Sequence, residues 1–142
     1  MTQSAAYWEH FDHEADIGVR GVGPTLAQAF EQAALAMSAV ITPLENIDTR
    51  QAITIECTGD DPEVLLVDWL NALVYEMATR NMLFGRYAVQ IESGTLTATA
   101  WGEPVDVQKH QPAVEIKGAT YTALRVTKTG DGSWIAETVV DV

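Results

Sequence analysis

The stretch IGVRGVGPTLAQAFEQAALAMSAVITP, residues 17–43, changes hydrophobic period partway along and decides the fold class. Residues 17–22 alternate in the manner of a strand with one buried face. From Thr25 onward, apolar side chains recur every three or four residues, as on one face of a helix. Thr25 and Gln28 form a capping box where this helix begins, and residues 42–43 (Thr-Pro) end it. A strand therefore leads directly into a helix.

A second helix is predicted to begin after Asp61. Asp61 suits the N-cap, Pro62 suits the first turn, and Glu63 interacts favourably with the positive end of the helix dipole. A broad apolar face follows, so this helix should be well buried; it comprises Val64, Leu65, Leu66, Trp69, Leu70, Leu73, Val74 and Met77.

The rest of the chain has the alternation and turn residues of strands. Glu92-Ser93-Gly94-Thr95 is a hairpin signal between two of them. Strands are predicted at residues 53–57, 87–91, 96–100, 119–126 and 134–140. The order β-α-β-α followed by hairpins predicts an α+β fold, in which two helices cover one face of a mainly antiparallel or mixed sheet. We expect residues 1–142 to form one domain, because 142 residues with 47% hydrophobic content suffice for one core.

The chain is acidic, with 20 Asp and Glu against 8 Lys and Arg and a net charge of −12. Nucleic-acid affinity comes mainly from basic side chains, so strong direct binding of RNA or DNA is not expected. An acidic chain is instead suited to binding a cation or a basic protein surface. The N-terminal residues lack the pattern of a signal peptide, and no segment has the length of a membrane span, which predicts a cytoplasmic location without membrane association. The single cysteine, Cys57, is predicted to be an inert thiol on the apolar face of a strand.

Acidic side chains gather at both ends of the sequence. Residues 11–18 read FDHEADIG, and the chain closes with Val139-Val140-Asp141-Val142. If the strand after the first cluster pairs with the last strand in antiparallel fashion, Asp12, His13, Glu14 or Asp16 meets Asp141 and the α-carboxylate of Val142. Carboxylates about 4–6 Å apart repel one another unless a proton or a cation intervenes. Oxygen ligands suit a hard divalent cation such as Ca²⁺ or Mg²⁺. The alternative is that these acids simply solvate strand ends.

Several motifs, in order along the chain, resemble those of the archease family. Residues 12–18 (DHEADIG) are similar to its DHTADIG opening, and residues 65–75 (LLVDWLNALVY) resemble its LLxxWLNxLLY helix. Trp101-Gly102-Glu103 with Asp106 and His110 is similar to its WGE…D…H segment. Residues 115–121 (EIKGATY) resemble EIKAxTYH, and the ending matches a terminal DV or DI.

This resemblance implies an accessory protein, not an enzyme. Archeases assist RtcB-type RNA ligases, which join 2′,3′-cyclic phosphate and 5′-hydroxyl RNA ends in tRNA splicing and RNA repair with GTP and Mn²⁺. The archease promotes guanylylation of the ligase and so multiple turnover. Its metal site, described with Ca²⁺, maps by the same resemblance onto Asp16, Asp141 and Val142. Mg²⁺ or Mn²⁺ would also suit such a site.

Three residues depart from the family motifs, namely Glu14 for Thr, Gly118 for Ala and Thr122 for His. Five further residues are candidates to support the ion or to contact the partner: Asp12, His13, Glu14, Lys117 and His110. Each has an ordinary alternative. His13 could be held by local hydrogen bonds, Lys117 could form a simple ion pair, and His110 could lie in a solvated loop. Two other functions remain open, a free-standing metal-dependent phosphoester hydrolase and a metal-independent chaperone-like binding module.

Overall fold

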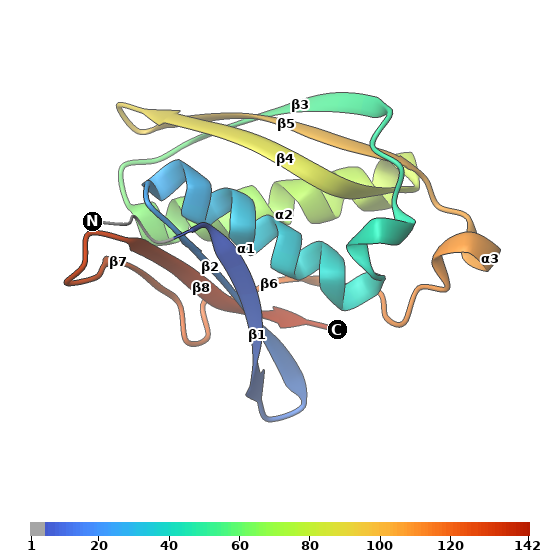
Figure 1. Ribbon diagram of the computed structural model, residues 1–142, viewed down its shortest axis with the longest axis horizontal. Coiled ribbons are helices and arrows are strands. Elements are labelled where there is room, and N and C mark those ends of the chain that lie inside the picture. The colour runs from blue at the N-terminus through green and yellow to red at the C-terminus, as the bar shows by residue number, and fades with distance from the viewer. Residues whose placement is uncertain (1–4) are drawn as a thin grey trace.

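A computed structural model describes residues 5–142, and in it the two long helices lie between two antiparallel sheets (Figure 1). The helices are α1 (Leu26–Ile41) and α2 (Pro62–Arg80), with two short helical turns, η1 (Leu44–Asn46) and α3 (Val107–His110). The strands are β1 (Tyr7–His13), β2 (Asp16–Gly23), β3 (Gln51–Thr58), β4 (Met82–Glu92), β5 (Thr95–Pro104), β6 (Gly118–Ala119), β7 (Arg125–Lys128) and β8 (Trp134–Asp141). The predicted α+β class and antiparallel pairing are confirmed. The strands, however, form two sheets rather than the expected one.

Helix α1 is the central element, with β2 and β8 on one side and β4 on the other. The predicted cap is present, because the Thr25 hydroxyl oxygen accepts a hydrogen bond of 3.1 Å from the Gln28 amide. Small residues let α1 approach β2 closely. A Cβ placed on Gly21 would lie 2.1 Å from the Ala29 carbonyl oxygen, so only glycine fits there.

Helix α2 begins at the predicted cap, where Asp61 accepts a hydrogen bond of 2.9 Å from the Glu63 amide. It ends at Asn81 in the left-handed conformation, with φ of 54°. The fully buried Trp69 links the two helices by donating through its indole nitrogen to the Phe30 carbonyl at 3.1 Å. The core predicted from the apolar faces of both helices is therefore continuous between the sheets.

The first sheet has the order β1-β2-β8, with β6 and β7 both on the far side of β8. Two strand predictions needed correction here. Residues 119–126 were predicted as one strand, but β6 and β7 are separated by a turn with Ala123 at φ 53°. The strand β1 was not predicted, and it contains Asp12 and His13, which were expected to precede the first strand. The predicted 17–22 strand, now β2, pairs antiparallel with the last strand.

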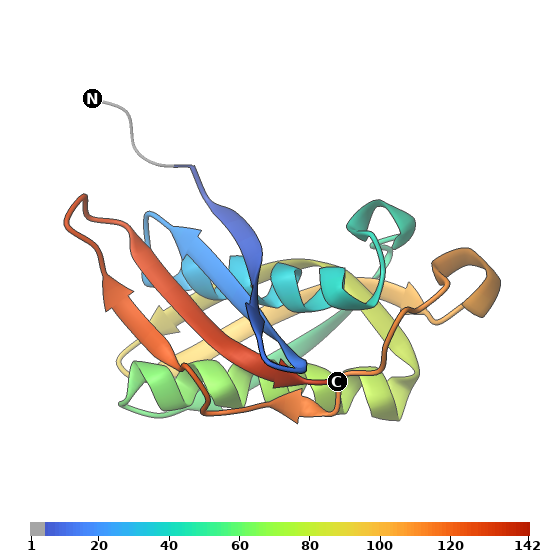
Figure 2. The ribbon, with the colours of Figure 1, turned by 90° about the horizontal axis from the view of Figure 1, so that it is seen from below.

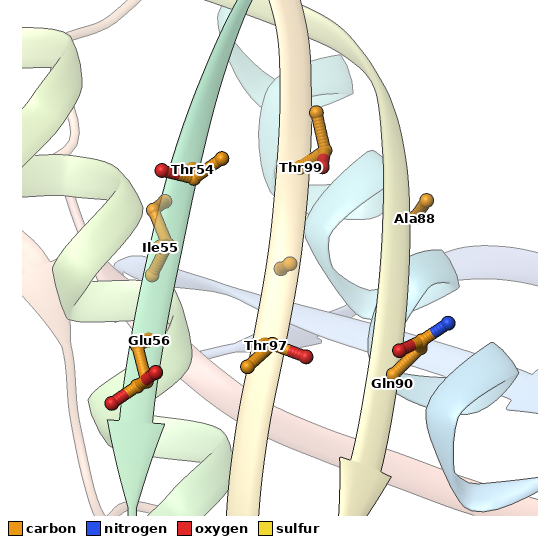
Figure 3. Close-up of a pocket in the computed structure, with 8 residues that line it drawn as sticks. Thr54, Ile55, Glu56, Ala88, Gln90, Thr97 and Thr99 are labelled. Carbon is orange, nitrogen blue, oxygen red and sulfur yellow. The ribbon is translucent and has the colours of Figure 1, made fainter.

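The second sheet has the order β3-β5-β4, and its predicted hairpin at residues 92–95 is present. Its inner face covers the helices, and its outer face carries a shallow hollow of about 530 Å³ (Figure 3). Small and polar side chains line this hollow, including Thr54, Thr97, Thr99 and Gln90. Cys57 on β3 is half-buried, and burial raises the pKa of its thiol, in keeping with the inert thiol predicted.

Glutamates on the helices bind backbone amides of the sheets. Glu31 of α1 accepts from the Val89 amide at 2.8 Å, and Glu63 of α2 accepts from the Val126 amide at 3.3 Å. Such capping protects strand edges against pairing with other chains. None of the helices among residues 5–142 is long and apolar enough to cross a membrane.

Candidate functional site

The register of the first sheet places Asp16 and Asp141 side by side. The pairing of β2 with β8 matches Ile17 to Val140, so in an antiparallel pair Asp16 and Asp141 come next at that end. On either flank, His13 of β1 is opposite Asp16 and Gly118 of β6 is opposite Asp141. These four residues form a row across four strands, and the chain end marked C in Figure 2 lies beside it.

The two acids also point to the same face of the sheet. Arg20 and Glu137 lie opposite each other four residues further along β2 and β8, and their side chains form a salt bridge of 2.7 Å. Because side chains alternate with a period of two, residues four apart share a face. Asp16 and Asp141 are therefore on the face that carries Arg20 and Glu137, which is the outer face, away from α1.

Neither carboxylate is neutralised within the part of the chain that is described. The Asp16 and Asp141 side chains form no hydrogen bond or ion pair with another of residues 5–142, whereas Arg20 and Glu137 pair with each other. No group of three or more His, Cys, Asp or Glu side chains among these residues is arranged to hold a metal ion. The predicted ligand set has two such side chains and an α-carboxylate. This all-oxygen donor set fits a hard divalent cation.

The hairpin turn between β1 and β2 holds the remaining predicted residues of the first cluster. Glu14 occupies the turn with φ of 53°, a left-handed conformation that is uncommon for a residue with a side chain. Its exposed carboxylate stands at the tip, while Asp12 lies on β1 opposite Ile17. The turn brings His13 opposite Asp16 but leaves Asp12 and Glu14 outside the row.

Helix α2 fixes the other flank of the row through Asn71. The Asn71 side-chain oxygen accepts from the Ala119 amide at 2.8 Å, and its amide nitrogen donates to the Ala119 carbonyl at 3.4 Å. Just before β6, the Lys117 amide donates to the Asp141 carbonyl of β8 at 2.8 Å. The two-residue β6 is thus held between β8 and a side chain, at the level of Asp141. Asn71 was not among the predicted site residues.

Comparison with known proteins identifies the family of this chain. Residues 8–142 match the Archease protein family (MTH1598/TM1083). The chain is 40% identical over 139 residues to protein archease of Pyrococcus furiosus, covering 95% of this chain and 98% of that protein. The chain belongs to the archease family. It is also 39% identical to protein archease of Methanosarcina barkeri, with 100% of both chains covered.

A solved structure supports the archease fold as well. The solution structure of protein 1598 of Methanobacterium thermoautotrophicum matches with a TM-score of 0.83 and 32% identity. The match covers 95% of this chain and 98% of that chain. The archease motifs predicted from sequence therefore occupy the β1–β2 hairpin, α2, β5 with α3, the β6 segment and the end of β8.

The archease-like WGE…D…H segment forms a cluster of its own around Glu103 and is not part of the row. Glu103 accepts a salt bridge of 2.7 Å from Lys109, a hydrogen bond of 2.8 Å from the Asp48 amide, and one of 2.8 Å from His110 Nε2. These contacts, Lys109 first, lower the pKa of Glu103 from its ordinary 4.5 to about 2. Asp106 caps α3, accepting from the amides of Gln108 and Lys109.

His110 is a structural residue in this arrangement. Its side chain is 0% exposed, and its Nδ1 accepts from the Asp106 amide at 2.9 Å while Nε2–H donates to Glu103. Both ring nitrogens are used, so neither is available as a metal ligand. The hypothesis of a solvated loop is wrong for His110, and a direct partner contact by this buried ring is not supported. Lys117 by contrast is exposed, and no ion pair of its side chain occurs among residues 5–142.

Of the other two departures from the archease motifs, Gly118 belongs to the row and Thr122 follows β6. A Cβ on Gly118 would stand 3.2 Å from the Asn71 side-chain oxygen, so glycine here gives the Asn71 contact slightly more room than alanine would. Thr122 is exposed in the turn after β6, where its carbonyl accepts from the Val139 amide at 3.2 Å.

Proposed function

We propose that this protein is an accessory activator of an RtcB-type RNA ligase in tRNA splicing and RNA repair, acting on ligase guanylylation and turnover from the cytoplasm. Membership of the archease family supports the role of a protein that works through a partner. The single observation that carries the proposal is the register of β2 and β8, which sets Asp16 beside Asp141 on one face with no counter-ion among residues 5–142.

In this proposal Asp16, Asp141 and the α-carboxylate of Val142 hold a divalent cation. Bound there, the ion would neutralise the adjacent carboxylates and offer an electrophilic centre for phosphate oxygens. Ca²⁺ is the ion implied by the family, and Mg²⁺ and Mn²⁺ share its preference for oxygen donors. The chain's own contribution is to position the two carboxylates, through β2–β8 pairing and through the Asn71 contact that holds β6 beside Asp141.

Two histidine contacts argue against a hydrolase that uses a nucleophile activated by either of these histidines. His10 Nε2 bonds to the Ala36 carbonyl at 2.7 Å, and His110 bonds to Glu103. Neither ring contacts a serine, threonine or cysteine side chain within residues 5–142. Nucleophilic catalysis by such a side chain requires a contact of this kind with a base. The metal-dependent hydrolase therefore remains the second candidate, and it would use the same carboxylates.

The test is RNA ligation by a cognate ligase with GTP and a divalent metal, with this protein added at substoichiometric concentration. The wild type should restore multiple turnover, while Asp16→Asn and Asp141→Asn should lose most of this effect. Asp60→Asn is the matched control, because it removes the same charge from an exposed aspartate that lies between β3 and α2, outside the row. Single-turnover ligation with wild-type protein present would contradict the proposal.

Two other results would favour the alternatives. Hydrolysis of a phosphoester by the purified protein alone, abolished by Asp16→Asn, would establish the hydrolase. Full activation by both Asp16→Asn and Asp141→Asn would favour the metal-independent binding module.

A further inference from the structure

Exposed apolar side chains concentrate along one flank of α2. The structure has five exposed large apolar side chains among residues 5–142, and three of them belong to α2 or to the segment packed beside it. Tyr75 is 65% exposed, Tyr121 is 64% exposed, and Val64 is 37% exposed. Tyrosine is enriched in protein interfaces because it offers a large rigid contact area with a polar tip.

The segment of residues 114–126 runs antiparallel to α2 along its length. Val114 and Ile116 line a cavity with Val74 and Met77 near the end of the helix. Further on, Ala119 is hydrogen-bonded to Asn71, and the Val126 amide is hydrogen-bonded to Glu63 at the start of the helix. The β6 strand runs beside α2 in Figure 2 accordingly.

This alignment sets the two tyrosines on either side of the contact between Asn71 and Ala119. Tyr75 lies one helical turn beyond Asn71, about 6 Å along the axis. Tyr121 lies two residues beyond Ala119, in the opposite direction. We call the resulting surface the tyrosine face and define it by Val64, Asp68, Asn71, Tyr75, Lys117 and Tyr121. The four helical members, at positions 64, 68, 71 and 75, follow the spacing of one helix stripe, and all four are exposed.

The tyrosine face adjoins the row that contains Asp141. Its Lys117 donates from the backbone to the Asp141 carbonyl, and its Asn71 holds the strand that pairs with Val140 and Asp141. A protein docked on the tyrosine face would therefore lie beside the end of β8 that carries Asp141.

The charge on and around this face is negative. The exposed acids Asp68, Glu115 and Asp141 form no ion pair within residues 5–142, and Lys117 is the single lysine or arginine of the face. The nearby Arg125 is already bound to Glu137 at 3.2 Å. Tyrosine rings bind arginine and lysine through cation–π contact, which strengthens where water is excluded.

We propose that the tyrosine face is the docking surface for the partner protein, and that it receives a patch of arginine and lysine side chains on that partner. This inference rests on the proposed function, because the partner meant is the RNA ligase that the protein activates. The tyrosines supply the buried anchors, and the surrounding acids complement the basic patch and direct its approach.

The test measures the dissociation constant between the full-length protein and the purified cognate ligase, by calorimetry or biolayer interferometry. Tyr75→Ala and Tyr121→Ala should each raise it by about tenfold or more, as expected for interface anchors. Tyr7→Ala is the control, because Tyr7 is 48% exposed on β1, away from α2. Thermal unfolding and metal titration of each variant should match the wild type, which separates lost docking from lost folding or a lost metal site.

Charge is tested with Asp68→Lys and with salt. Both the substitution and an increase in ionic strength should weaken ligase binding if the partner's patch is basic. Unchanged affinity of both tyrosine variants, while Asp16→Asn still abolishes activation, would overturn the tyrosine face and leave the proposed function standing. Wild-type protein that neither binds nor activates the ligase would overturn both.

Discussion

At the scale of single residues, the most informative side chain is one that the sequence did not single out. Asn71 has the position of an exposed polar residue on an amphipathic helix, where solvation is the usual role. Its amide instead satisfies both backbone groups of Ala119, 48 residues away. A single sequence contains no local signal for such a long-range contact. The meeting of the two acidic ends could be expected, because antiparallel pairing of the first predicted strand with the last one brings them together, and the archease motif then singled out Asp16 and Asp141.

Asn71→Ala tests this positioning role. Loss of both amide contacts should lower the free energy of unfolding by about 0.5–1.5 kcal/mol, the usual worth of a hydrogen bond. It should also weaken divalent-metal binding and speed hydrogen exchange at the amides of Ala119 and Thr120. Asn46→Ala is the control, because no Asn46 side-chain hydrogen bond occurs among residues 5–142. Metal affinity equal to that of the wild type would show that β6 does not position Asp141.

Glu103→Gln tests the separate cluster through its pH dependence. The pKa of Glu103 is lowered to about 2, so its charged form stabilises the fold fully above its ordinary pKa of 4.5. That contribution is lost as the pH falls from 4.5 toward 2. Urea unfolding should find the variant less stable at pH 7 and the difference reduced at pH 2. Glu92→Gln is the control, because Glu92 is exposed and its side chain forms no ion pair among residues 5–142. A pH-independent difference would contradict the assignment.

At the scale of elements, helices with strong hydrophobic periodicity were predicted correctly, whereas strands with weak periodicity were missed or given wrong bounds. Both long helices begin at the predicted caps, because the capping residues and apolar stripes are local signals. The expected strand at residues 119–126 breaks because Thr120 and Thr138 hydroxyls bond to backbone carbonyls there. Such bonds compete with regular pairing. Strand β1 escaped prediction because its side chains alternate mostly between exposed and half-buried positions, without a clear apolar face.

Gly21→Ala tests the close approach of β2 to α1. The new methyl group would lie 2.1 Å from the Ala29 carbonyl oxygen, so the helix and the strand must separate. Overpacking of this kind costs about 1–3 kcal/mol or more in unfolding free energy, measured by urea denaturation. Gly130→Ala is the matched control, because a Cβ there has nothing within 4 Å. Equal loss in both variants would mean that the cost is not steric.

At the scale of the whole molecule, the sequence predicted the fold class but not the arrangement of its layers. Hydrophobic periodicity indicates which face of a helix or strand is apolar, but it does not indicate how many sheets pack against a helix. Helix α1 packs against both sheets because Ala29, Ala33, Ala34 and Ala36 are fully buried and let strands approach it from both sides. In the same arrangement β2 and β8 pair side by side, and so Asp16 and Asp141 lie next to each other.

Direct metal titration of the isolated protein is the most decisive measurement, because it needs no partner. Calorimetric titration with Ca²⁺ and with Mn²⁺ should detect about one ion per chain. Asp16→Asn and Asp141→Asn should each weaken binding by at least about tenfold with thermal unfolding of the metal-free protein unchanged, and Asp60→Asn should bind as the wild type does. The account would be contradicted if Asp16→Asn and Asp141→Asn bound Ca²⁺ and Mn²⁺ with the same affinities as the wild type.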